Sequence, residues 1–181
     1  SSSDHPPIDG TISDTPSSDT SAGAFALTST AFAASATVPT DNTCNGADSS
    51  PPLAWTGAPS MAQSFALVLT DQSLQPPKLH WVIYDIPVAT TSLPASVENV
   101  YAPASVPGAH QTMSEAGKTV GYAGPCPQPP PTTHMYQFAL YALDVTPLPG
   151  GAAQTTAAEA LASIETHKLA NTTLIGIATK P

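Results

Sequence analysis

The sequence predicts a mostly β, antiparallel domain with proline-rich loops and one helix near its C-terminus. Several short runs of β-branched and aromatic residues are bounded by turn residues, as is typical of strands. The 21 prolines favour many loops and few long helices, and only one stretch has a helical composition. With 181 residues the chain is long enough for one hydrophobic core, so we expect a single folded domain.

Five segments are expected to form strands. Each combines apolar, β-branched and aromatic residues over a short length, and they are residues 25–32, 64–71, 79–87, 135–144 and 174–180.

The single helix is expected over residues 155–171. Thr155 or Thr156 is suited to cap its N-terminus. A partial stripe at helical spacing supports the assignment, and it consists of Leu161, Ile164, Lys168 and Leu169.

The first 24 residues are rich in Ser, Thr, Asp and Pro and contain almost no large apolar side chain. Such a segment cannot bury enough surface to offset its ordering entropy, so we expect a disordered tether ahead of a domain over residues 25–181. A tail of this kind suits an exported or lipid-anchored bacterial protein whose signal peptide has been removed, the alternative being a boundary through a natural linker. We therefore expect an extracytoplasmic location: periplasmic, secreted or lipid-anchored.

The charge balance excludes several classes of partner. The net charge is −9, and the four basic residues are all lysines. A nucleic-acid-binding surface needs a basic stripe that this chain does not provide, and a basic amphipathic helix for anionic membranes is also missing. No stretch approaches the roughly 20 apolar residues of a membrane span.

Four residues able to do chemistry lie at the ends of expected strands. Asp71 ends one strand and His80 begins the next, while His134 and Tyr136 begin a third and share a face because strand side chains alternate. If these strand ends meet, they form a cup with one carboxylate, two imidazoles and a phenol. The spacing alone favours the alternative, in which each histidine is a core residue with a satisfied hydrogen bond.

A stiff loop precedes this third strand. Gly124 and Cys126 offer backbone N–H groups, and the adjacent prolines, Pro125 among them, hold the loop rigid. Exposed N–H groups on a fixed loop beside histidines form an anion-binding concavity.

The order of four segments resembles the phosphatidylethanolamine-binding protein family, and more narrowly its bacterial Raf-kinase-inhibitor-like branch. The segments are "CNGADSSPPLAWTGAPSMAQSFALVLTD", "HWVIYDIP", "GYAGPCPQPPPTTHMYQFALYALD" and "ETHKLANTTLIG". The resemblance implies a two-sheet antiparallel β-sandwich with a small pocket for phosphate-like head groups. The positions that match the family pocket are Asp71, His80, Tyr122, Gly124, His134 and Tyr136.

The sequence departs from the family pattern at the pocket. Gln72 and Ser73 replace the first proline and the second aspartate of the D-P-D-A-P motif, and Met135 replaces the arginine of H-R-Y. An ion pair near the pocket is therefore lost, and we expect an anion to be held by backbone N–H groups and histidines alone. Because imidazole has an ordinary pKa of about 6.5, binding should strengthen in mild acid. Asp71 itself is expected to orient His80 by accepting its ring N–H.

The two cysteines, Cys44 and Cys126, predict one disulfide, because an even count in an exported chain favours pairing. This bond would tie the segment around Cys44 to the pocket loop. The alternative is a free, nucleophilic thiol at Cys126 beside His134.

Two further histidines, His110 and His167, are given no part in chemistry. His110 lies in a polar loop and is expected to be solvated, and His167 resembles a structural helix histidine of the family. His80, His134 and Asp71 would also suit a metal triad, but the family pocket implies anions, so no metal or cofactor is expected.

Two functions remain open. The first is a non-enzymatic binding protein that captures an anionic, phosphate-like small molecule and, by analogy, inhibits a kinase or protease. The second is a small-molecule enzyme of hydrolase, lyase or isomerase type, with His80 and His134 as general acid and base. No nucleophile motif of the G-x-S-x-G or H-E-x-x-H type supports the second function. A monomer or a homodimer is expected.

Overall fold

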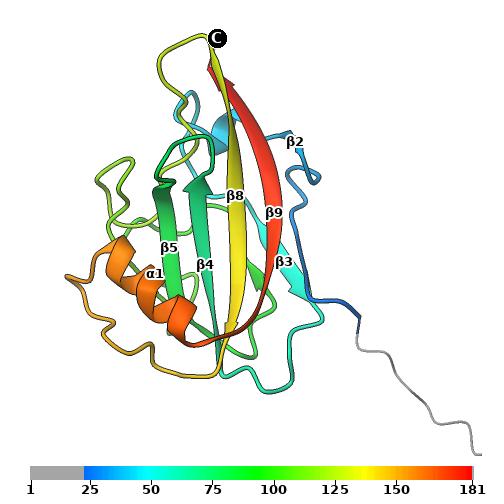
Figure 1. Cartoon of the computed structure of the whole chain (residues 1–181), viewed down its shortest axis with the longest axis vertical. Helices are drawn as coiled ribbons and strands as arrows, with labels where there is room; N and C mark the ends of the chain where they lie inside the picture. The colour runs from blue at the N-terminus through cyan, green and yellow to red at the C-terminus, as the bar shows by residue number, and fades with distance from the viewer. Residues whose placement is uncertain (1–22, 181) are drawn as a thin grey trace, which may run out of the picture.

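A computed structural model of the chain describes residues 23–180, so nearly all of the expected tether lies outside the described residues. These residues form nine strands, one α-helix and a short 3-10 helix (Figure 1). The strands are β1 (Ala26–Thr28), β2 (Ala36–Thr37), β3 (Leu53–Thr56), β4 (Ser64–Asp71), β5 (Lys78–Pro87), β6 (Ser92–Leu93), β7 (His110–Gln111), β8 (Thr132–Leu143) and β9 (Lys168–Lys180). The 3-10 helix is Thr40–Asn42, and α1 is Ala157–Thr166.

The strands form two sheets, which confirms the predicted fold class. A three-stranded sheet has the order β1-β3-β6, and a six-stranded sheet has the order β2-β9-β8-β4-β5-β7. All pairs in both sheets are antiparallel except the short parallel pair of β2 with β9. The short strands β2, β3, β6 and β7 were not expected from the sequence. β2, β6 and β7 have two residues each, too few to show a period of two, and β3 has only four.

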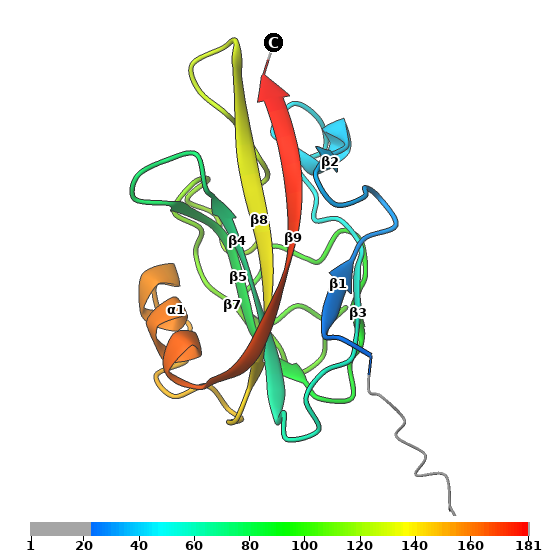
Figure 2. The same ribbon diagram turned by 45° about the vertical axis from the view of Figure 1, so that its right-hand side comes forward.

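Two hydrophobic cores lie on opposite faces of the six-stranded sheet. Alternation along β8 sends Phe138 and Leu140 toward the smaller sheet, and it sends Ala139 and Tyr141 toward α1. The helix covers one face of the lower part of β4 and β5 (Figure 2). The domain is therefore a β-sandwich with one helix on its outer face.

The helix is shorter than the 155–171 range that the sequence predicts. Thr156 caps its N-terminus in a reciprocal capping box with Glu159, and His167 is the C-cap. β9 begins at Lys168, whose backbone pairs with Leu143 of β8. The predicted continuation to residue 171 was wrong because strand pairing with β8 overrides the helical spacing of Lys168 and Leu169.

The described chain begins toward the lower end of the molecule in Figure 1, whereas the end of β4 and the starts of β5 and β8 lie at the upper end. None of the helices within residues 23–180 has the length and hydrophobicity needed to cross a membrane.

A disulfide joins Cys44 to Cys126 across a sequence separation of 82 residues, as the cysteine count predicts. The alternative of a free nucleophilic thiol at Cys126 is therefore wrong in this structure. The bond links the loop after the 3-10 helix to the loop before β8.

Replacing both cysteines by serine (Cys44→Ser with Cys126→Ser) is expected to lower the free energy of unfolding by about 4 kcal/mol, because the lost bond no longer restricts the unfolded chain. Urea titrations of the oxidised protein and of the double variant measure the difference. The reduced wild-type protein serves as the control and should match the double variant. A loss below about 1 kcal/mol would contradict the expectation.

Candidate functional site

The ends of three neighbouring strands enclose a cavity of about 250 Å³. Asp71, the last residue of β4, pairs with Lys78 of β5 on one side and with Tyr136 of β8 on the other. The cavity, which we call the cup, is lined by Asp71, Leu74, Lys78, His80, Ala116, Cys126, Gln128 and His134. Four of the predicted site residues, Asp71, His80, Cys126 and His134, therefore line one cavity.

A β-bulge turns His80 into the cup. Leu69 pairs with Trp81, but the next residue, Thr70, pairs with Leu79, so His80 has no partner on β4. Leu79 packs in the core under α1 and Trp81 in the core between the sheets. The bulge leaves the His80 side chain free to line the cup, where its ring meets Tyr136 edge-on at 5.3 Å between centroids.

His80 is almost fully buried, with 3% of the residue's surface exposed. Its Nδ1 lies 2.9 Å from the carbonyl oxygen of Ala123, which accepts only, so Nδ1 carries the proton. Burial lowers the pKa of His80 below its ordinary value of 6.5, and the hydrogen bond to Ala123 opposes this only in part. His80 is therefore neutral near pH 7, with Nε2 as its second nitrogen.

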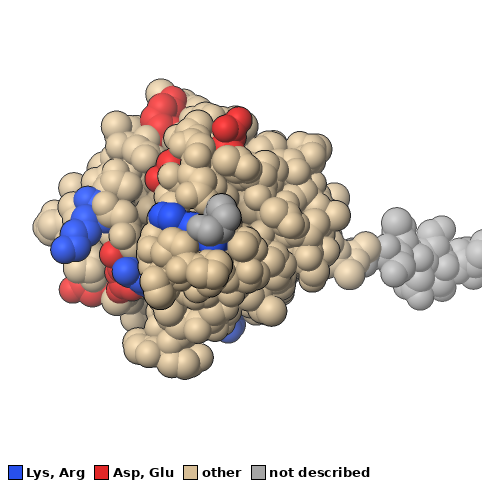
Figure 3. Space-filling view, turned by 90° about the horizontal axis from the view of Figure 1, so that it is seen from above, with Lys and Arg blue, Asp and Glu red and all other residues tan. Residues whose placement is uncertain are grey.

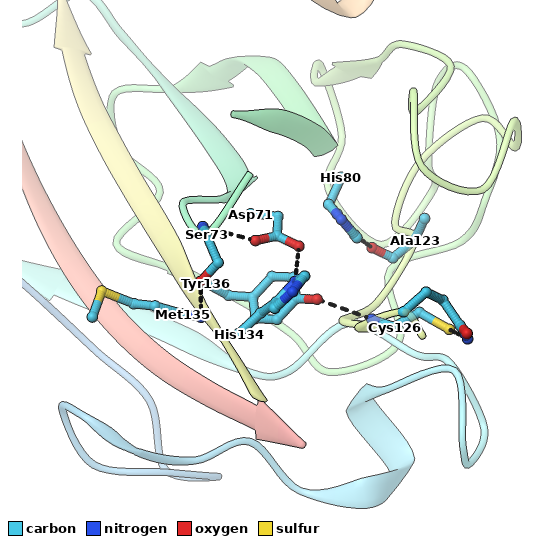
Figure 4. Close-up of polar contacts among 9 residues, drawn as sticks. Asp71, Ser73, His80, Ala123, Cys126, His134, Met135 and Tyr136 are labelled. Atoms are coloured by element: carbon cyan, nitrogen blue, oxygen red, sulfur yellow. Dashed lines mark hydrogen bonds and ion pairs between the residues drawn. The ribbon is translucent and has the colours of Figure 1, made fainter. Parts of the chain in front are cut away.

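Asp71 orients His134, not His80 as the sequence analysis expected. The Asp71 Oδ2 atom lies 2.7 Å from His134 Nδ1, and Oδ1 accepts a hydrogen bond from the backbone N–H of Ser73 at 2.9 Å (Figure 4). The expectation was wrong because the bulge places the His80 ring against Ala123, while pairing of β4 with β8 brings His134 to the carboxylate. The pair is largely buried, with 12% of the His134 side chain and 3% of the Asp71 side chain exposed.

The two backbone N–H groups that were predicted as anion donors already have partners. Gly124 N–H donates to Asp48 Oδ1 at 2.7 Å, and Cys126 N–H donates to the Tyr136 hydroxyl at 3.2 Å. Tyr136 is fully buried, and burial, with the nearby Asp71 charge, holds its pKa above the usual range. The loop therefore supplies a rigid wall, and the expectation of exposed N–H groups at these two positions was wrong.

The segment around Cys44 holds this loop from behind. Tyr122 is buried, packs edge-on against Trp81, and donates its hydroxyl to the carbonyl of Asn42 at 2.6 Å. The carbonyl of Pro125 accepts the Cys44 N–H at 3.1 Å, next to the disulfide. Tyr122, Gly124 and Pro125 thus support the wall of the cup without lining it.

Lys78 is a cup residue that the sequence analysis missed. It is the first residue of β5, two positions before His80, and it supplies a cation where none was expected. Strand alternation backward from His80 would have indicated it. Seen from the end of the molecule where the C-terminal residues lie, lysines appear among scattered acidic side chains on a largely uncharged surface (Figure 3).

Ser73 and Met135, two of the residues that depart from the family pattern, are joined by a hydrogen bond. Ser73 Oγ accepts the backbone N–H of Met135 at 2.9 Å. The Met135 side chain points away from the cup and is 46% exposed (Figure 4). These residues tie the loop after β4 to β8 without placing any charge beside the cup.

Two histidines outside the cup each pair with an aspartate. His110 lies 3.0 Å from Asp85 and stacks on Tyr101, so the expectation of a purely solvated ring was wrong. His167 lies 3.0 Å from Asp144 at the end of the helix. Within residues 23–180, no group of three or more His, Cys, Asp or Glu side chains is arranged to hold a metal ion.

Known proteins are similar to this chain in sequence or in fold. The family model described as phosphatidylethanolamine-binding protein matches residues 28–179. A UPF0098 protein of Methanothermobacter thermautotrophicus is 42% identical over 144 residues, which are 77% of this chain and 89% of the relative. A Mycobacterium tuberculosis protein described as a candidate lipoprotein, LppC, is 34% identical over 138 residues, 75% of this chain and 64% of its own length. The crystal structure of Escherichia coli YbcL, described as a member of the mammalian PEBP family, has a TM-score of 0.79 and 25% identity, covering 87% of this chain and 99% of YbcL.

The burial of His80 predicts a loss of stability in mild acid. The pKa of His80 is lowered in the folded state. The contribution of the neutral ring to the free energy of unfolding is therefore complete above the unfolded pKa of about 6.5 and is lost as the pH falls toward the folded pKa. In urea titrations of the wild type between pH 8 and 5, this one proton should lower the free energy of unfolding by at most about 1.4 kcal/mol for each pH unit of acidification. In His80→Gln that part of the pH dependence should vanish, and an equal pH dependence of the two proteins would contradict the expectation.

Proposed function

The chain belongs to the phosphatidylethanolamine-binding protein family, and from this membership we propose that its cup binds a small phosphorylated anion. The observation that carries the proposal is the set of three nitrogen groups around one cavity: Lys78, His80 and His134. A cavity of about 250 Å³ suits a phosphate-sized group more than a large organic ligand.

The hydrogen bonds of the cup favour an anion that binds together with protons. Nδ1 of His80 and Nδ1 of His134 are occupied by Ala123 and Asp71, which leaves Nε2 of both rings for a ligand. A neutral ring presents a lone pair at Nε2, whereas a protonated ring donates an N–H to a phosphate oxygen. With both rings neutral, the charges of Lys78 and Asp71 cancel, so a phosphate gains most when at least one ring takes up a proton.

The buried carboxylate does not prevent anion binding. Both oxygens of Asp71 accept hydrogen bonds, one from His134 and one from Ser73. The negative charge is therefore directed toward these donors and away from the cavity.

A second candidate function is an enzyme that uses the same cup. The observation that favours it is the 2.7 Å contact between Asp71 and His134, since a buried carboxylate that fixes a histidine tautomer is a common support for a general base. His80 would then be the second acid or base. Because burial keeps the His80 ring neutral, it would act more readily as a base than as an acid.

We place the protein outside the cytoplasm, in the periplasm, secreted, or anchored to a lipid. The disulfide suits an oxidising compartment, and the relative LppC is described as a candidate lipoprotein. A regulatory role toward a kinase or protease, which the family resemblance implies, stays a prediction.

Anion binding should appear in the histidine ring NMR signals during titration with phosphate, phosphoethanolamine or sulfate. His80 and His134 are expected to shift together and saturably, with affinity rising by up to about tenfold per pH unit between pH 8 and 6 for each proton taken up. Sulfate keeps one charge state over this range, so its pH dependence reports the protein groups alone. Phosphorus NMR of the same samples detects any hydrolysis of the phosphoester and so tests the enzyme alternative.

Lys78→Gln should weaken sulfate binding about tenfold, because a charge-assisted hydrogen bond is lost. Lys118→Gln is the matched control, since it makes the same change in net charge at a lysine that does not line the cup. Equal effects of the two variants, or ring signals that do not respond to any anion, would overturn the proposed function.

A further inference from the structure

A second, larger cavity lies on the other face of the six-stranded sheet, between α1 and the loop that joins β4 to β5. This groove has a volume of about 530 Å³, within the range of about 300–1,000 Å³ typical of small-molecule sites. Figure 2 shows the helix and the loop on the same side of the sheet. Leu79 lines the groove, whereas its neighbours Lys78 and His80 line the cup, so the two sites lie back to back.

The floor and the helix wall of the groove are mostly apolar, although Thr70 and Gln137 also line the floor. Strand residues form the floor, among them Val68, Ala139 and Tyr141, and the helix contributes Leu161 between two alanines, Ala158 and Ala162. The helix docks on the sheet through a different set of residues, Ala157, Ala160 and Ile164, which are buried. On its groove side the helix carries two alanines whose side chains are too short to reach the floor. The space between helix and floor therefore stays unfilled.

All charge on the lining of the groove is negative. Glu115 and Glu165 are the only charged residues that line it among residues 23–180. Glu165 is already paired, since it accepts hydrogen bonds from the Tyr141 hydroxyl at 2.9 Å and from Lys168 Nζ at 2.7 Å. Glu115 Oε2 accepts the backbone N–H of Leu79 at 3.1 Å, and its Oε1 atom has no partner among the described residues.

We propose that the groove binds an amphiphilic cation: an organic ammonium whose aliphatic or aromatic body lies on the apolar floor and whose charge pairs with Glu115. The apolar walls supply contact area for the body, and the free carboxylate oxygen supplies the acceptor for the ammonium. An anionic amphiphile would meet the unpaired oxygen of Glu115, and a second copy of this chain would bring its own net charge of −9 against it. The charge of the groove thus selects for a cation, opposite to the selection at the cup.

The test uses three probes that contain eight carbon atoms each: octylammonium, octanol and octanoate. Binding is followed by backbone amide and methyl NMR of the full chain, with Leu161, Ala139 and Leu79 as reporters. Octylammonium is expected to shift these signals saturably, octanol to bind about fivefold more weakly, and octanoate to bind most weakly.

Two variants test separately the contact of the ammonium group and the contact of the alkyl chain. Glu115→Gln keeps an oxygen acceptor for the Leu79 N–H, and it should reduce the affinity for octylammonium about fivefold while leaving octanol within about twofold. Glu98→Gln is the matched control, because it removes one charge from an exposed carboxylate that does not line the groove. Ala162→Phe should fill the groove from an exposed helix position and abolish binding of both probes without altering the fold.

The proposal is overturned if octylammonium gives no saturable shift at the groove reporters. It is equally overturned if the three probes bind alike, or if Glu115→Gln and Glu98→Gln have the same effect on octylammonium. None of these results depends on the cup, since sulfate titration reports the cup separately.

Discussion

The buried carboxylate of Asp71 is the group on which the geometry of the cup depends. A buried charge is costly unless hydrogen-bonded, and this one is satisfied by the His134 ring and the Ser73 backbone. These bonds connect the end of β4 to the start of β8 and to the loop that leads into β5. One side chain thus fixes three segments, and it does so where regular sheet hydrogen bonding ends.

The opposite wall of the cup depends on contacts from far away in the sequence. The loop over residues 122–126 is held by the disulfide, by Asp48, and by the carbonyl of Asn42. Its N–H groups at Gly124 and Cys126 are used to build this wall and are not left free for a ligand. Rigidity and ligand donation compete for the same backbone groups here, and the side chains of Lys78, His80 and His134 are left to face the cavity.

The sequence alone predicts a residue's role where that role follows from the alternation of side chains along a strand or from the number of cysteines. It placed Asp71, His80 and His134 at strand ends, and it paired Cys44 with Cys126. It could not find the bulge at His80, since the register of β5 against β4 is set by packing on both faces of the sheet. It also could not assign the partner of Asp71 or the partner of the Gly124 N–H, because those contacts join residues 63 and 76 positions apart.

The place where the chain enters the domain has a consequence for how ligands reach it. The described N-terminal end lies toward one end of the molecule and the strand ends that form the cup toward the other (Figure 1). A contact that holds the domain at this described end would therefore leave the mouth of the cup facing away from that contact, where solutes reach it directly.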